Sequence, residues 1–133
     1  MGALVADTHT LVWYLLEPER LSGNAAASLE RAELDGDLIY LSAISLVELC
    51  YLTEKGRVPT IVLDEVLEGL VKGTSRLSLA PVDLDISRAV RQIPREVVPD
   101  MPDRIIAATA RHLGLPLVTH DQKIQSSGLQ TIW

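Results

Sequence analysis

Four carboxylates spread along the chain have the types and positions to form a single chemical site. Asp7 follows the apolar run at residues 4–6, and Glu48 lies inside the apolar stretch at residues 43–52. Asp103 opens an apolar segment, and Asp121 closely follows another at residues 117–118. If the fold brings these groups together, their charges repel unless a cation lies between them or some of them hold protons. The pattern predicts a divalent-metal site, and a nuclease is the function it favours.

Each acid alone also has a structural interpretation. Asp7 can cap a helix that begins at the next residue, and Asp121 can cap a short helix at residues 122–126. Glu48 follows Ser45 by three residues, the spacing of a capping box. Asp103 can lie in the first turn of a helix, where the helix dipole stabilises a negative charge. The joint pattern therefore supports the metal site better than any single residue does.

Six further residues adjoin the acids and are candidates for orienting them or for contacting a substrate: Thr8, His9, Asp100, Arg104, Thr119 and His120. The two threonine hydroxyls can orient a carboxylate or a metal-bound water, although capping competes for them. Asp100 has a second interpretation as a helix cap. Arg104 is a candidate phosphate contact, with a helix-surface salt bridge as its alternative.

Alternating apolar strands and helices predict the elements that position these residues. We expect strands at 3–6, 38–41, 77–82 and 116–119, with a fifth at 129–133. We expect helices at 8–16, from Ser22 or Asn24 to about 34, and at 42–55, 59–72, 83–92 and 103–112. Such alternation is typical of a parallel sheet with helices on both faces, a three-layer α/β/α domain of four to five strands. Ligands of these sheets bind beyond the carboxyl ends of the strands.

Size and composition limit the functions that are open to the chain. Its 133 residues are expected to form one domain over 1–133, and Cys50 has no partner for an internal disulfide. No apolar run approaches the roughly 20 residues of a membrane span, so we expect a soluble, cytoplasmic protein. The net charge of −6 argues against a broad phosphate-binding surface. Residues 1–75 contain five basic and twelve acidic side chains, whereas residues 76–133 contain seven and six, so the second half is better suited to meet an anion.

Four segments, taken in order, resemble a known family. Residues 5–13 (VADTHTLVW) resemble the opening of PIN domains, in particular of the VapC ribonuclease toxins. Residues 42–49, 102–108 and 117–124 resemble the second, third and fourth acidic motifs of that family. One departure is that Asp100-Met101-Pro102 replaces the more usual aromatic residue before the third acid, which affects the expected loop shape.

The resemblance implies an endoribonuclease in which Asp7, Glu48, Asp103 and Asp121 hold Mg²⁺ or Mn²⁺. A metal-activated water would cleave RNA, leaving a 5′-phosphate and a 3′-hydroxyl, with tRNA or ribosomal RNA as the substrate class. The resemblance further implies a VapB-like antitoxin and a homodimer. The apolar segments 11–16 and 59–72 are where we expect the antitoxin to dock, while Arg88, Arg91 and Arg95 are candidate contacts to the RNA backbone, or simply a solvated face.

Other functions remain open at this stage. A phosphatase of the haloacid-dehalogenase type would need a second Asp two residues after Asp7, where the chain has His9. A receiver domain would need paired acids near the first strand. A non-catalytic binding module is disfavoured because all four acids are present. A housekeeping RNA-processing or DNA nuclease of the same fold is the main alternative.

Overall fold

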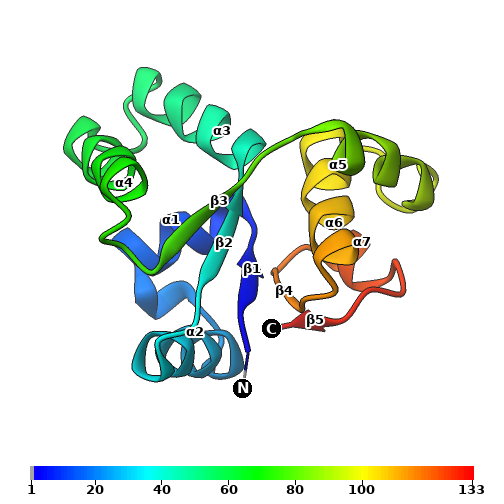
Figure 1. The fold of residues 1–133 in the computed structure, drawn as a ribbon, viewed down its shortest axis with the longest axis horizontal. Helices are drawn as coiled ribbons and strands as arrows, with labels where there is room; N and C mark the ends of the chain where they lie inside the picture. The colour runs from blue at the N-terminus through cyan, green and yellow to red at the C-terminus, as the bar shows by residue number, and fades with distance from the viewer. Residues whose placement is uncertain (1) are drawn as a thin grey trace.

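A central sheet of parallel strands organises the computed structural model, which describes residues 2–133 (Figure 1). The strand order is β3-β2-β1-β4-β5. The strands are β1 (Leu4–Ala6), β2 (Ile39–Ser42), β3 (Leu77–Ala80), β4 (Leu117–Val118) and β5 (Thr131–Ile132). All five expected strands are therefore present, each shorter than or shifted slightly from its predicted range.

The first strand is the centre of the sheet. In β1, Leu4 is in register with Ile39 of β2, and Val5 with Leu117 of β4. The chain builds outward from β1 to β3 on one side and then returns to build β4 and β5 on the other. This reversal of strand order leaves a crevice beyond the carboxyl ends of β1 and β4, the position where open α/β sheets bind ligands.

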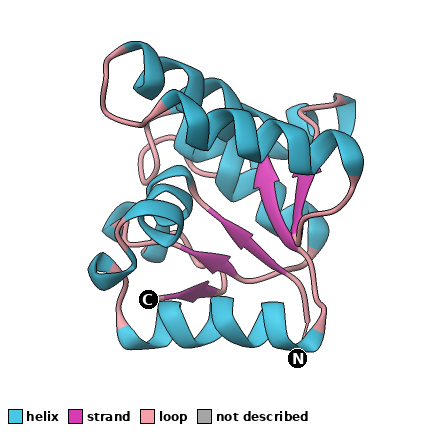
Figure 2. Ribbon diagram, turned by 90° about the vertical axis from the view of Figure 1, so that its left-hand side faces the viewer, coloured by secondary structure: helices cyan, strands magenta, loops and turns pink. Residues whose placement is uncertain are grey.

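Helices cover both faces of the sheet, so the predicted three-layer α/β/α architecture is confirmed (Figure 2). The helices are α1 (Thr8–Leu16), α2 (Gly23–Asp35), α3 (Ala43–Glu54), α4 (Thr60–Lys72), α5 (Leu84–Ala89), α6 (Met101–Leu113) and α7 (Gln122–Gln125). Two short 3₁₀ turns, Pro18–Arg20 and Val90–Gln92, follow α1 and α5.

The side chains of β1 alternate between two hydrophobic clusters, as the period of a strand requires. Val5 packs with Ile106 of α6 and Leu117 of β4 in one cluster. Leu4 and Ala6 point the other way, into a cluster with α2. Burying an aliphatic side chain of this size stabilises the fold by about 1.5–3 kcal/mol. The clusters therefore fix the end of β1, and with it the position of Asp7.

Three local expectations were wrong. Helix α6 begins at Met101 and not at Asp103, because Asp100 caps it and Pro102 fits its first turn. The helix expected at 83–92 ends at Ala89 and continues only as a 3₁₀ turn. Tyr51 follows Glu48 by three residues on a mostly apolar face of α3, a spacing that predicts an inward-facing side chain, yet it is 60% exposed. Within residues 2–133, no helix is both long and apolar enough to cross a membrane.

Candidate active site

Asp7 lies directly beyond the central strand and is almost fully buried, with 6% of its surface exposed. Its Oδ1 accepts a hydrogen bond of 2.8 Å from the backbone N–H of Thr10, which makes it the N-cap of α1. The capping interpretation is thus confirmed. It does not exclude a second role, because this bond uses one oxygen of the carboxylate and fixes the direction of the other.

Glu48 projects from α3 toward the start of α1, where Thr8 holds it. The Thr8 hydroxyl donates to Oε1 of Glu48 at 2.5 Å and lies 2.8 Å from the hydroxyl of Ser45. Since Thr8 has a single hydroxyl proton, the Ser45 hydroxyl must supply the proton of their mutual bond. Ser45 is fully buried and lies one turn before Glu48. The capping box of Ser45 and Glu48 is therefore wrong, and Ser42 caps α3 instead.

Asp103 lies in the first turn of α6, and its acidity is strongly perturbed. Its pKa is raised from the ordinary 3.8 to about 7. The main cause is burial, which disfavours the charged form. Repulsion by four other carboxylates adds to it, in the order Asp100, Asp121, Asp7 and Glu48. A proton on Asp103 at neutral pH therefore relieves the charge repulsion that the sequence predicts.

Asp121 follows β4 and caps α7. Its Oδ1 accepts from the backbone N–H groups of Lys123 at 2.8 Å and Ile124 at 3.1 Å. The buried Thr119 hydroxyl accepts from the backbone N–H of Asp121 at 3.0 Å, which fixes the turn between strand and helix. The cap predicted for this residue is confirmed.

These residues meet in a cavity of about 170 Å³. Seven residues line it: Asp7, Thr8, His9, Glu48, Asp103, His120 and Asp121. All four acids named from the sequence are thus brought together, with three of the six accessory residues. Within residues 2–133, however, no three acidic or histidine side chains lie close enough to hold one ion directly.

The three remaining predicted residues lie outside this cavity and have structural contacts. Asp100 caps α6 by accepting from the backbone N–H of Asp103 at 3.2 Å, and Thr119 supports the turn before Asp121. Arg104 makes no ion pair within residues 2–133, so its helix-surface salt bridge is wrong, whereas its contact with a phosphate stays a prediction. Its Nη2 donates to the backbone carbonyls of Val90 at 3.0 Å and Ile93 at 2.9 Å, so this side chain fastens the 3₁₀ turn after α5 to α6.

Two supporting hydroxyls were missed by the sequence analysis. Ser45 was considered only as a cap, although its spacing to Glu48 already places both on one face of α3. The fully buried Thr10 hydroxyl donates to the carbonyl of Val118 at 3.0 Å and so ties α1 to β4. These residues are 108 positions apart, and no local signal predicts the contact.

Comparison with known proteins identifies the family. The model of the PIN domain matches residues 4–127, nearly the whole chain. The chain belongs to the PIN-domain family. Ribonuclease VapC22 of Mycobacterium tuberculosis (strain ATCC 25618 / H37Rv) is 30% identical to this PIN domain over 126 residues, which cover 95% of this chain and 92% of VapC22.

Solved structures with the same fold are components of VapBC complexes. DNA-bound VapBC from Salmonella typhimurium contains a chain that matches this PIN domain with a TM-score of 0.71 at 25% identity, covering 98% of this chain and 97% of that one. VapBC2 from Rickettsia felis, bound to a DNA fragment from its promoter, matches with a TM-score of 0.72 at 19% identity, covering 97% and 96%. The resemblance to VapC toxins inferred from the four motifs is therefore confirmed.

Proposed function

We propose that this PIN domain is a divalent-metal-dependent endoribonuclease of the VapC type and the toxin of a toxin–antitoxin pair. Family membership and the relationship to Ribonuclease VapC22 support a nuclease. The observation that carries the finer proposal is the cavity lined by Asp7, Glu48, Asp103 and Asp121, in which the pKa of Asp103 is raised to about 7.

The donor set of the cavity fits Mg²⁺ or Mn²⁺, because hard cations prefer carboxylate oxygen. Asp7, Asp103 and Asp121 would hold the ion partly through its waters, with Glu48 direct or through water. Mg²⁺ usually keeps several waters and takes only one or two carboxylates, so three direct protein ligands are not required. When bound, the ion supplies neutralising charge at the phosphate and lowers the pKa of a bound water.

The chain's own contribution is to hold its carboxylates in fixed directions before substrate arrives. The N–H of Thr10 fixes Asp7, and the Thr8 hydroxyl fixes Glu48. Asp103 and Asp121 lie in or at the first turn of a helix, where the exposed N–H groups stabilise negative charge. Such preorganisation avoids reorganisation during the reaction, when charge builds up on the phosphate.

RNA is the proposed substrate, with tRNA or ribosomal RNA as its class and 5′-phosphate and 3′-hydroxyl ends as its products. His9 and His120 are exposed and line the cavity, so an entering strand would meet them first. The net charge of −6 disfavours tight binding along a long backbone. This favours recognition of a short, open stretch of RNA, such as a loop.

A VapB-like antitoxin is the proposed partner. Helices α1 and α4 present exposed apolar side chains, including Leu15, Ile61 and Val71. A groove of about 370 Å³ over α3 and α6 shares Thr8, His9 and Glu48 with the acidic cavity. A basic, apolar segment lying in it would reach the acids, which suits the acidic surplus of the first 75 residues. The homodimer remains a prediction.

The main alternative is a housekeeping RNA-processing or DNA nuclease of the same fold. The match over 92% of Ribonuclease VapC22, a protein of similar length, favours the toxin. A non-catalytic binding module is less well supported, since the cavity retains all four acids.

The deciding experiment maps cleavage sites on total cellular RNA after brief expression of the chain, followed by assays of the purified protein. We expect site-specific RNA cleavage with Mg²⁺ or Mn²⁺, none with chelator, and none by Asp7→Asn or Asp103→Asn. Asp64→Asn, at an exposed acid on α4, is the matched control and should retain full activity. Cleavage that survives both active-site changes would reject the assignment, and cleavage of DNA in preference to RNA would favour the alternative.

A further inference from the structure

An aromatic cluster lies beside the acidic cavity, and only its two histidines have entered the function proposed so far. It consists of four rings: His9, Trp13, His120 and Trp133. The ring centroids of Trp13 lie 5.9 Å from His9, 5.8 Å from His120 and 5.8 Å from Trp133, and those of His120 and Trp133 are 5.0 Å apart. We call these four residues the aromatic platform.

Three separate segments build the aromatic platform, and it opens to solvent on the side of the cavity. His9 and Trp13 lie one turn apart on α1, His120 follows β4, and Trp133 follows β5. The imidazoles of His9 and His120 are exposed and also line the acidic cavity, whereas the two tryptophans are half-buried behind them. Ring surface is therefore available within one residue of Asp121.

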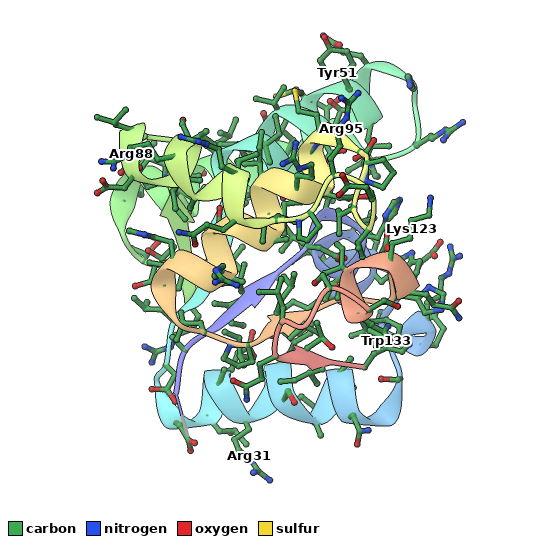
Figure 3. The ribbon with its side chains drawn as sticks, turned by 90° about the vertical axis from the view of Figure 1, so that its right-hand side faces the viewer. Arg31, Tyr51, Arg88, Arg95, Lys123 and Trp133 are labelled. Carbon is green, nitrogen blue, oxygen red and sulfur yellow. The ribbon has the colours of Figure 1, made fainter. Side chains whose placement is uncertain are left out.

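One basic side chain contacts the platform, and a second lies toward the same edge of the molecule. The guanidinium of Arg20 lies over the Trp13 ring, 4.6 Å from its centroid. Lys123 follows Asp121 by two residues, and Figure 3 shows Lys123 and Trp133 toward the same edge of the molecule. Arg20 pairs with Glu17 only at the surface, at 3.1 Å, so its charge can still meet a phosphate.

We propose that the aromatic platform binds an unpaired nucleobase of the RNA next to the phosphate held in the acidic cavity. Every base has a π face that stacks on an aromatic ring, and a base in a duplex cannot leave its neighbours without a cost in free energy. The platform thus positions the RNA and selects single-stranded substrate through the rings of His120, His9 and the two tryptophans. This inference rests on the proposed ribonuclease function.

A purely structural role makes a different prediction. If the platform only packs Trp133 against α1, replacing its rings lowers stability and affects all substrates alike. If it stacks a base, the loss depends on whether a base is present at one position of the substrate. The exposed His120 is the best residue to change, because its ring contributes little to the buried core.

Tryptophan fluorescence gives the first test, because both tryptophans of the chain belong to the platform. Asp103→Asn protein with Mg²⁺ is titrated with a short single-stranded oligoadenylate and, separately, with the same strand annealed to its complement. We expect the single strand to quench the emission and the duplex to leave it unchanged. Equal quenching by both, binding seen by anisotropy without quenching, or no binding would each overturn the inference.

The second test couples the protein to the substrate. On a mapped cleavage site, the bases flanking the scissile bond are replaced one at a time by abasic positions. For the wild-type chain, we expect one such position to lower kcat/KM by roughly tenfold to a hundredfold, the range of one base–aromatic stack. In His120→Ala the same abasic change should lower kcat/KM little further. In His120→Phe the dependence of kcat/KM on that base should return.

The exposed His112 on α6 provides the matched control, and His112→Ala should behave as wild type. The inference would be overturned if His120→Ala and His120→Phe lost equal amounts of kcat/KM and if the abasic position lowered kcat/KM in both variants as much as in wild type. The two proposals fail in different ways. A wild-type chain that cleaves no RNA rejects the ribonuclease, whereas normal cleavage without coupling to a base rejects only the aromatic platform.

Discussion

Replacing Asp103 by Asn should stabilise the protein at alkaline pH while abolishing its activity. The unfolded chain ionises this carboxyl near pH 3.8, whereas the folded chain holds its proton up to about pH 7. Between these values the folded state binds more protons than the unfolded state, so its stability falls as pH rises. Above pH 7 the carboxyl is ionised in both states, and the loss of stability caused by its burial as a charged group stays constant at its full value.

The size of the effect follows from the shift. The folded and unfolded pKa values differ by about three units, which corresponds to ~4 kcal/mol of unfolding free energy. About half of that, 2 kcal/mol, remains after discounting for the solvent that reaches this half-buried group. Because Asn cannot ionise, Asp103→Asn should unfold about 6–8 °C above wild type at pH 8, and close to wild type at pH 4. The difference should grow through the interval between pH 4 and pH 7.

Thermal unfolding in chelator at several pH values measures this directly, with Asp64→Asn as the control for removing one surface charge. Added Mg²⁺ should then raise the melting temperature of wild type more than that of Asp103→Asn, because a ligand stabilises only the state that binds it. A variant that is less stable than wild type at pH 8, or equally shifted at pH 4 and pH 8, would refute the electrostatic reasoning.

Three further changes test the supporting contacts. Thr8→Val should lower RNA cleavage at least tenfold and stability by about 1–3 kcal/mol, because it frees Glu48 and leaves the Ser45 hydroxyl unpaired. Thr8→Ser keeps the hydroxyl and should retain both activity and stability. Steady-state kinetics and denaturant unfolding compare the two variants with wild type. Arg104→Met should cost about 2 kcal/mol of stability through its two lost carbonyl bonds; if RNA affinity measured by filter binding falls instead, the side chain contacts substrate after all. Thr10→Val should cost about 1 kcal/mol, because the carbonyl of Val118 loses one of two donors and keeps only the backbone N–H of Asp7. Unchanged urea unfolding would show that this tie between α1 and β4 is unimportant.

Local patterns predicted those parts of the fold that local physics decides. Apolar runs of the right length located all five strands, and the helix of Thr8–Leu16 has the bounds its sequence indicates. Gly56 has φ of +73°, the left-handed geometry expected of a glycine that ends a helix. Strand order could not be predicted in this way, since it depends on pairings such as Val5 with Leu117, which are distant in the sequence.

The acids of the candidate site could be predicted from the sequence, but the side chains and backbone groups that hold them in place could not. Asp7 and Asp121 follow strands and Asp103 lies in the first turn of a helix, positions that parallel strands direct to one edge of the sheet. Glu48 is different, because it lies in the middle of α3. The structural contacts of Arg104 were not predicted because its partners are backbone carbonyls, which have no sequence signature. The aromatic platform escaped notice for a similar reason: Trp133 meets Trp13 only through the packing of β5 and α1.

The central place of β1 has a consequence for how the enzyme comes into being. Its neighbour β4 is made more than a hundred residues later, and Asp121 later still. A nascent chain can therefore assemble the β3-β2-β1 side of the sheet while half of its acidic cavity has yet to be synthesised. Under the proposed function, such a chain cannot cleave RNA until the final fifth of its sequence, which contains Asp121, has left the ribosome.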